Sequence, residues 1–551
     1  MKHAQGIFKT EEYQENLKYD NCNEVENKQD IKVYKLINLI INIILLFVIF
    51  YLYNQYISNI NQLSQNIKKI IYFIFIISSI YLILATNYIL WNRKYKLEKL
   101  FLIVMIPVSI CYSLLMIPGM VPDEATHMRL TYSLASQIMG VEQDKITLRS
   151  EEKYIYDRLP TTPNMDSYNY SYSHFFSGED NKNYVTIDVD SANWKQIFGY
   201  FPAVLGVIFS RIMHFGATPT IYIARLCNLF FYLWLTYFSI KKIPIGKQLI
   251  FMIAILPMCS QQMMSLSYDA VLNASTFFCL AYGLFFVYNS EDVKFDEYIK
   301  FLFSAILILS IKSAVYSFVL LIPLLSKFKS LDSNLKIERK QKVILFLSIS
   351  IFILIMNFVS FGNSTTKEAV ETAATTKNII SWSGTEGYTI RWLISHPIDG
   401  IILFFRTINL KGEWYYYSCL GQDLSWFTVK LPLEIFNVWG ILLLVCALKK
   451  EDNQLDKNMR TLFVIINLII FFLVLLSMCI YWTPLTFDHI EGVQGRYFIP
   501  IVYTILIVAN NKKIALKENY YSYINIFACL LTVITIVNLI NVCFANGTII
   551  G

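Results

Sequence analysis

The sequence predicts an all-α fold, a polytopic transmembrane helix bundle whose outer-face loops carry short helices. The chain has 551 residues, of which 55% are hydrophobic and only 16% charged. Its apolar residues fall into runs long enough to cross a bilayer, separated by short polar stretches. Several of the polar stretches are rich in lysine and arginine, as cytoplasmic loops of membrane proteins are. These observations exclude a soluble multidomain protein, and the net charge of +7 is ordinary for a membrane protein and does not indicate a nucleic-acid partner.

Three regions follow from this pattern. Residues 1–33 are polar, of mixed charge, and lack the basic start and short apolar core of a cleaved leader. We therefore expect a cytoplasmic N-terminal segment there, followed by two extra transmembrane helices in residues 34–99. Residues 100–551 form the main transmembrane domain.

The apolar runs predict about thirteen spans. They lie near 34–53, 70–91, 100–118, 220–240, 248–266, 270–289, 343–361, 431–449, 460–481, 496–510 and 520–545, and a broken stretch at 299–326 adds two. Lysine and arginine are retained on the cytoplasmic side, which assigns to that side the loops 92–99, 241–247, 327–342, 449–460 and 511–517. This assignment requires two short apolar stretches, 197–216 and 398–410, to be interfacial or re-entrant. Three polar regions then lie on the extracytoplasmic face, at 119–196, 362–430 and 482–495.

The first outer loop opens on the stretch PDEATHMR, which places two acids and a histidine where the chain leaves the bilayer. Pro122 suits the first turn of a helix, so we expect a helix from Asp123 to Gln137. Helical spacing would put Asp123, Glu124 and His127 on one face. The alternative is that the acids merely favour a helix N-terminus through the helix dipole.

Two further charged residues interrupt apolar runs. Asp269 is either a turn residue between two helices or an acid lining the same cavity as Asp123. Lys312 is a lone ammonium flanked by apolar residues, which needs a partner such as a lipid phosphate unless it reaches the interface by snorkelling. Arg129 adds positive charge beside the first acids.

The remaining polar motifs lie in the second and third outer regions. The stretch FDHIEGVQGRYFIP combines Asp488, His489, Glu491 and Arg496 with two glycines. An arginine can bind a phosphate or carboxylate through two hydrogen bonds at once. The alternative is a polar loop whose arginine anchors it at the membrane interface. Side chains of the second region that could bind a glycan by stacking and hydrogen bonding are Arg391, His396, Arg406, Lys411, Glu413 and Trp414.

The sequence contains no phosphate-binding Walker loop, no dinucleotide fingerprint, no HExxH helix and no GxSxG elbow. It therefore shows no sign of nucleotide hydrolysis, redox chemistry or a protease site. An enzyme that works on the outer face cannot use cytoplasmic nucleotide sugars. Any synthesis at these loops needs a donor that is carried across the membrane by a lipid.

Four stretches, PDEATHMRLTYSLA, SYDAVLNASTFFCLAYG, KSAVYSFVLLIPLL and GVQGRYFIP, occur in this order. From about residue 100 onward the chain resembles a family of uncharacterised bacterial polytopic membrane proteins with the motifs P-x-D-E-x-x-H-x-x-R and Q-G-R-Y-F-x-P. PDEATHMR has the residue types of the first motif with one residue fewer after the proline and before the arginine, and QGRYFIP fits the second. That family is similar to the GT-C superfamily of integral membrane glycosyltransferases. The resemblance implies a GT-C-type bundle that takes a sugar from a polyprenyl-phosphate donor.

The resemblance also assigns roles. Asp123 matches the GT-C acid that acts as a general base or orients the acceptor, with Glu124 beside it, while Arg496 and Lys312 would supply positive charge to the departing phosphate. A divalent metal, Mg or Mn, is possible because Asp123, Glu124 and Asp269 are hard oxygen ligands, although many GT-C members need none. The full set of candidates comprises the catalytic residues Asp123, Glu124 and His127 and the substrate-binding residues Arg129, Asp269, Lys312, Arg391, Trp414, Asp488 and Arg496.

The leading interpretation is a glycosyltransferase that modifies a cell-wall polysaccharide, teichoic acid or other surface glycan. Two alternatives remain open, a transporter or flippase for a lipid-linked glycan and a non-catalytic subunit of an envelope-assembly complex. The charged motifs lie on one side only, which argues against a transit path. Because ionisable groups at the ends of apolar runs must share water, a ligand or one another, we also expect Asp123, Asp269 and Arg496 to converge.

Overall fold

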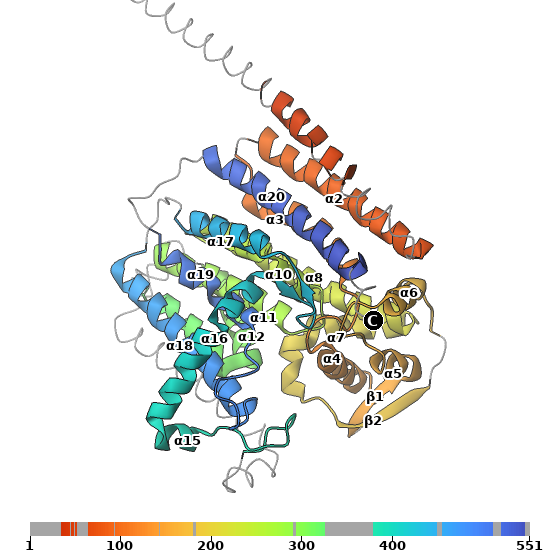
Figure 1. Cartoon of the computed structure of the whole chain (residues 1–551), viewed down its shortest axis with the longest axis vertical. Coiled ribbons are helices and arrows are strands. Elements are labelled where there is room, and N and C mark those ends of the chain that lie inside the picture. Colours follow the sequence, from red (N-terminus) through yellow and green to blue (C-terminus); the bar gives the residue numbers. More distant parts are fainter. Residues whose placement is uncertain are drawn as a thin grey trace, which may run out of the picture.

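The computed structural model is mostly helical, as predicted. It describes residues 33, 35–44, 46–48, 50, 51, 64–92, 94–142, 144–179, 183–289, 294–325, 378–448, 455–510 and 519–545. In these ranges six helical segments are long and apolar enough to cross a membrane, which are α2 (Gln65–Trp91), α3 (Leu97–Leu115), α8 (Ala217–Lys242), α11 (Asp269–Tyr288), α18 (Lys457–Tyr481) and the segment Tyr520–Phe544. The last of these combines α20 (Asn519–Ile540) with the π-helical turn η5 (Asn541–Ala545). Figure 1 shows α2, α3 and α20 running side by side.

Further helical segments complete the bundle. They are α9 (Lys247–Ala254), α10 (Pro257–Met263), α12 (Phe295–Tyr316), η3 (Ser317–Leu325), α17 (Leu433–Ala447), η4 (Gly495–Phe498) and α19 (Ile499–Ile507). The span expected at 248–266 is therefore two helices, because a proline at the first position of α10 cannot continue the hydrogen-bond ladder of α9. The span expected at 343–361 lies outside the described residues, and the expected number of spans is not confirmed.

The described residues beside four of the basic loops meet at one end of the bundle. Their contacts are hydrogen bonds from Asn525 Nδ2 to Tyr95 Oη (2.6 Å), from Arg460 Nη1 to the Val508 carbonyl (2.7 Å) and from Tyr503 Oη to the Ile245 carbonyl (2.7 Å). The described residues in or beside the loops 92–99, 241–247 and 449–460 thus share one end with Val508, as the parity of the spans predicts. The stretch 511–517 itself lies outside the described residues. The fifth basic loop, 327–342, lies outside the described residues.

A compact group of elements fills the part of the chain between α3 and α8. These elements are α4 (Glu124–Ile138), β1 (Lys145–Arg149), α5 (Ser150–Tyr156), α6 (Met165–Ser173), β2 (Tyr184–Asp190) and α7 (Ile197–Ile212), and Figure 1 shows them gathered together. β1 and β2 pair antiparallel. This region therefore contains strands in addition to the short helices that were predicted. A separate hydrophobic cluster, including Met128, Leu148 and Val204, gives this loop its own core.

The two short apolar stretches that were expected to be interfacial or re-entrant, 197–216 and 398–410, form helices of different length. α7 has 16 residues, packs along α8 and is not among the six long apolar helices. The stretch 398–410 belongs to the longer helix α16, which is preceded by a short helix and followed by a small hairpin. The bounds are α15 (Ile390–Ser395), α16 (Pro397–Leu420), β3 (Asp423–Leu424) and β4 (Val429–Lys430).

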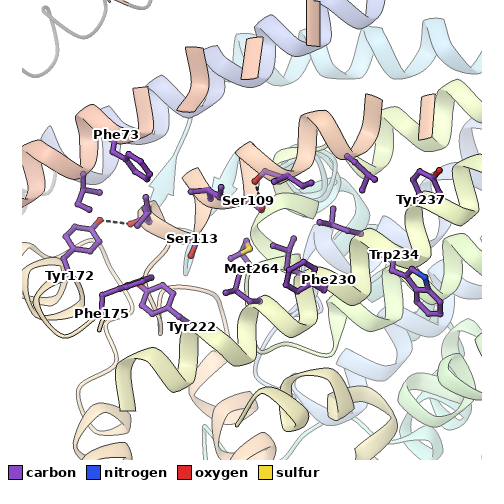
Figure 2. A pocket seen from close by; sticks show the side chains of 18 of the residues that line it. Phe73, Ser109, Ser113, Tyr172, Phe175, Tyr222, Phe230, Trp234, Tyr237 and Met264 are labelled. Atoms are coloured by element: carbon purple, nitrogen blue, oxygen red, sulfur yellow. Dashed lines mark hydrogen bonds between the residues drawn. The ribbon is translucent and has the colours of Figure 1, made fainter. Parts of the chain in front are cut away.

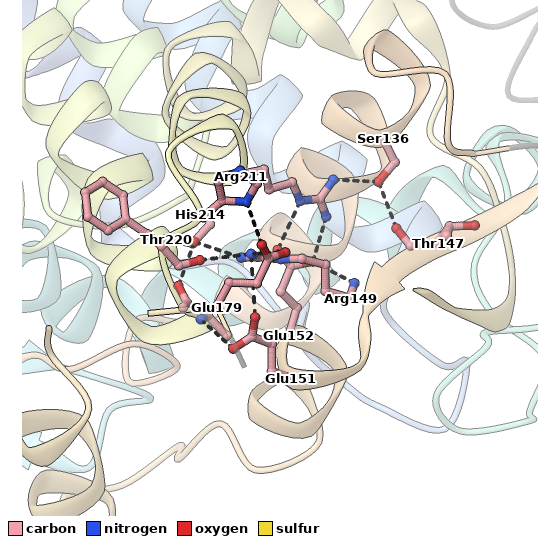
Figure 3. A network of polar contacts seen from close by, with 12 residues as sticks. Ser136, Thr147, Arg149, Glu151, Glu152, Glu179, Arg211, His214 and Thr220 are labelled. Carbon is pink, nitrogen blue, oxygen red and sulfur yellow. Dashed lines mark hydrogen bonds and ion pairs between the residues drawn. The ribbon is translucent and has the colours of Figure 1, made fainter. Parts of the chain in front are cut away.

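A buried ion network joins β1 and α5 to the turn between α7 and α8 (Figure 3). Glu152, fully buried on α5, accepts from Arg149 Nε at 2.8 Å and from Arg211 Nη2 at 2.6 Å. Arg149 also donates to the carbonyl of Phe215 at 2.9 Å. Although burial opposes ionisation, the two guanidinium groups hold the pKa of Glu152 below its usual value. The region between α3 and α8 is therefore held together through charge pairs as well as apolar packing.

Candidate functional site

Asp123 stands at the N-terminus of α4 but does not cap the helix through its side chain. α4 begins at Glu124, so Pro122 precedes the helix and does not stand in its first turn as predicted. Asp123 has a φ of 64°, in the left-handed region, and its side chain makes no capping hydrogen bond. Such a conformation is costly for a residue with a Cβ and occurs at functional sites where the surroundings enforce it. The carboxylate instead contacts Arg496, at 2.5 Å from Oδ2 to Nη2.

Arg496 connects the three segments that were expected to converge. Its Nη1 donates to the Pro122 carbonyl at 3.3 Å, and its Nε lies 3.6 Å from Asp269 Oδ2. The Arg496 side chain is 4% exposed and that of Asp269 11%, whereas that of Asp123 is 44% exposed. The predicted convergence is therefore confirmed, and Asp123 is the acid of the three-residue cluster that a substrate can reach most easily.

Glu124 has a different environment from its neighbour. Its Oε1 accepts from Arg225 Nε at 2.7 Å and from the Leu266 amide at 3.1 Å. Its Oε2 accepts from the Gly119 amide at 2.8 Å and from Arg225 Nη2. Four donors therefore occupy this buried carboxylate, which places Glu124 in a structural ion pair rather than at a position open to a substrate. Its partner Arg225 was not singled out from the sequence, although a lone arginine inside an apolar helix signals a buried acid.

His127 lies beside the cluster as a neutral group. Its Nδ1 is hydrogen-bonded to Tyr200 Oη at 2.8 Å, and its ring meets the Tyr268 ring edge-on at 5.1 Å. Burial lowers the pKa of the imidazole from 6.5 to about 4, although the carboxylate of Asp269 opposes this shift. At neutral pH His127 therefore contributes hydrogen bonding and shape rather than positive charge.

Lys312 brings a second cation to the same place. The α12 backbone is not helical at this residue, with φ −144° and ψ 61°. The ammonium nitrogen lies 4.5 Å from the ring centroid of Tyr497 and 5.2 Å from that of Tyr268. Aromatic faces stabilise a cation without neutralising it. Among the described residues Lys312 makes no ion pair, so its charge remains available to an anionic ligand.

The charged cluster lies in the part of the chain that matches a known protein family. Residues 108–505 match the model of DUF2142, described as a predicted membrane protein. The chain belongs to the DUF2142 family. No curated protein and no solved structure matches it. The matched segment contains Asp123, Asp269, Lys312 and Arg496, whereas α2 and α20 lie outside it.

Four other predicted residues of this DUF2142 protein make no contact with the cluster formed by Asp123, Asp269 and Arg496. Three take separate positions, and the fourth is a neighbour of His127 on α4. Arg391 is exposed on α15, Trp414 packs on the Phe427 ring at 5.2 Å, Asp488 is exposed and pairs with Arg406 at 3.0 Å, and Arg129 is half-buried with an Nε that lacks a hydrogen-bond partner. The structure therefore does not extend the cluster to these residues.

The acids of the DUF2142 cluster do not form a set of metal ligands. Glu124 is paired with Arg225, and the guanidinium of Arg496 stands between Asp123 and Asp269. In the described residues no group of three or more histidine, cysteine or acidic side chains could hold a metal ion. A divalent cation at this position would have to displace Arg496, so the residues do not fit the Mg or Mn site that was considered possible.

Proposed function

We propose that this DUF2142 protein is a membrane glycosyltransferase. It would transfer a sugar from a polyprenyl-phosphate-linked donor to a glycan or other envelope polymer on the outer face of the membrane. The observation that carries the proposal is the convergence of Asp123, Asp269, Arg496 and Lys312 at one site, which lies at the opposite end of α19 from Val508 and the residues beside the basic loops. Ionisable groups at a membrane edge mark functional sites when they cluster in this way.

The charges of the site suit this reaction. Asp123 and Asp269 balance Arg496 and Lys312, and His127 is neutral, so the cluster carries no net charge before a donor binds. A phosphodiester donor brings one negative charge, and the departing polyprenyl phosphate gains a second. Lysine and arginine aimed at that phosphate stabilise the developing charge.

The bonds, electrons and proton of the transfer step are all accounted for by the donor, the acceptor and the groups of the site. The acceptor oxygen forms a bond to the anomeric carbon of the sugar, and the bond from that carbon to the phosphate oxygen breaks. The electron pair goes to the phosphate, and the acceptor proton goes to Asp123. In the free protein Arg496 occupies this carboxylate at 2.5 Å. A donor phosphate competes for the same guanidinium, so donor binding would free Asp123 to act as the base.

The deciding experiment is transfer of a labelled sugar from a polyprenyl-phosphate donor by the purified protein in liposomes, with membranes of a deletion strain as acceptor. We expect label to move from the lipid to an envelope polymer, and the glycan of the deletion strain to lack that sugar. A transporter would move the intact donor across the bilayer without breaking the sugar–phosphate bond. Unchanged glycan in the deletion strain together with no transfer from any donor would contradict the proposal.

Arg496→Lys is expected to raise the KM for the donor by roughly 10- to 100-fold, because a point charge replaces a fork and one charge-assisted hydrogen bond of about 1.5–3 kcal/mol is lost. The measurement is donor-dependent kinetics in the liposome assay. Arg391→Lys is the matched control, since Arg391 is exposed on α15 and lies outside the cluster. Equal KM values for the two variants would remove Arg496 from donor recognition.

The proposed orientation has its own test. A cysteine at position 183, exposed just before β2, is expected to react with an impermeant maleimide in whole cells. A cysteine at Lys241, beside a basic loop at the other end of the bundle, should react only after permeabilisation. The reverse labelling pattern would place the charged cluster on the cytoplasmic side.

A further inference from the structure

A large apolar cavity lies within the membrane-spanning part of the molecule, apart from the charged cluster. Its volume is about 900 Å³, and its walls come from α2, α3, α8 and the segment around the end of α6. Figure 2 shows side chains of these elements facing one another across the space, among them Phe73, Tyr222, Phe230 and Trp234. We infer that this groove binds the isoprenoid chain of a polyprenyl phosphate, an inference that rests on the proposed function for its choice of lipid.

Several polar groups on the walls are bonded within the protein. Each of three hydroxyl groups has a partner in the protein: Tyr172 Oη donates to the Leu114 carbonyl (2.7 Å), Ser109 Oγ to the Ile106 carbonyl (2.7 Å), and Tyr222 Oη is hydrogen-bonded to Ser171 Oγ (2.8 Å). The remaining lining is almost entirely aliphatic and aromatic. A ligand that fits such walls is a hydrocarbon chain rather than a sugar or a peptide.

The groove exposes side chains that hydrocarbon must cover. Phe230 is 67% exposed, Trp234 54% and Phe73 49%, and all three stand on helices long and apolar enough to span the membrane. Inside a bilayer the molecules available to cover them are lipids. The concave shape favours one chain seated between the helices over the loose annulus of lipid that surrounds a convex surface.

The length of the groove distinguishes between kinds of chain. Its lining on α8 runs from Tyr222 to Phe238, which is about 24 Å at 1.5 Å per residue. The hydrocarbon core of a bilayer is about 30 Å thick, so an acyl chain of a phospholipid reaches only about 15 Å from its own side. A chain that fills this groove passes the midplane, as a polyprenyl chain can and an ordinary acyl chain does not.

Aromatic residues mark both ends of the groove. Phe175 packs on Tyr222 at 4.7 Å at one end, and Trp234 packs on Phe238 at 6.0 Å at the other, next to the basic end of α8. Tyrosine and tryptophan gather at membrane interfaces, so the groove runs from one interface to the other. Met264, which Figure 2 shows on the wall between Tyr222 and Phe230, precedes Asp269 by five residues in the chain. The groove therefore passes close to the segment that carries the acid of the charged cluster, to which the lipid phosphate would be brought.

A photoreactive residue tests the occupant directly. p-Benzoylphenylalanine at Phe230, in the groove, is expected to cross-link undecaprenyl phosphate in liposomes that contain it, and excess unlabelled undecaprenyl phosphate should remove the product. The control is the same residue at Phe472, which is half exposed on α18 outside the groove. Cross-links from Phe230 to phospholipid alone, or equal yields at both positions, would overturn the inference.

A blocking variant gives an independent readout. Ser113→Phe places a ring inside the groove and is expected to lower undecaprenyl phosphate binding at least tenfold, whereas Ser477→Phe on α18, also a half-buried serine on a spanning helix, should leave it unchanged. Geranyl phosphate, whose chain is too short to pass the midplane, should bind both proteins weakly. Equal binding by the two variants would show that the chain lies elsewhere.

The same experiments separate failure of the groove from failure of the enzyme. Binding is measured without turnover, so it can be performed on Asp123→Asn protein, where the groove is intact. Transfer activity with an unaffected donor KM in Ser113→Phe would reject the groove and keep the glycosyltransferase. Saturable binding at Phe230 in a protein that transfers no sugar would keep the groove and reject the glycosyltransferase.

Discussion

Replacement of Asp123 by asparagine is expected to lower the rate of sugar transfer by roughly two to four orders of magnitude, the range for loss of a general base. Asparagine keeps the volume of the side chain and tolerates the left-handed backbone at this position, where φ is 64°. It cannot accept the acceptor proton. The loss should therefore appear in kcat, and donor binding should change little because Arg496 and Lys312 remain.

The matched control is Asp399→Asn. Asp399 is an exposed acid in the first turn of α16, so its substitution removes a helix-terminal charge without touching the cluster. We expect full activity from this variant. If Asp123→Asn transferred sugar as fast as Asp399→Asn, the carboxylate of Asp123 would have no part in the chemistry and would serve only the fold around Arg496.

Arg225→Met is expected to lower the free energy of unfolding by about 3–5 kcal/mol, the cost of leaving a buried charge without its partner. Arg225 and Glu124 are both essentially fully buried, and the guanidinium also donates to the Met116 carbonyl at 2.6 Å. The measurement is the thermal midpoint of the purified protein in detergent, compared with Arg391→Met at an exposed position.

The double variant Glu124→Gln with Arg225→Met tests the reason for this loss. Removing both charges eliminates the unpaired ion, so stability should recover in part relative to Arg225→Met alone. A thermal midpoint for Arg225→Met equal to that of the control would mean that the pair does not contribute to the fold. No recovery in the double variant would mean that the loss has another cause, such as the contacts of Arg225 with carbonyl groups at the end of α3.

Much of the charged cluster was predictable because each of its members breaks a strong local pattern. Asp123, Asp269, Lys312 and Arg496 each interrupt or border an apolar run, and in a bilayer such a residue requires a partner. The meeting of described residues beside several basic loops at one end of the bundle was predictable because the basic loops impose a parity on the spans between them. The order of these signals along the chain was enough to expect that Asp123, Asp269 and Arg496 meet.

The different environments of the adjacent acids Asp123 and Glu124 could not be predicted from the sequence. Asp123 and Glu124 have the same charge and stand side by side, and spacing alone put both on the face of His127. The left-handed backbone at Asp123 directs one carboxylate to Arg496, while Glu124 is covered by Arg225 from another helix. Which acid is accessible depends on packing between segments far apart in the chain.

The sequence by itself determined the class of the protein, the end of the bundle that collects basic residues and the residues that need polar partners, because these follow from hydropathy and charge along the chain. Only the tertiary structure decided which residues are the partners. The break before Pro257, the buried network of Arg149, Glu152 and Arg211, and the groove lined by α2, α3 and α8 all depend on contacts between helices. The physical reason is that periodicity reports which face of a helix is apolar, whereas the distance from one helix to the next is set by side-chain packing in three dimensions.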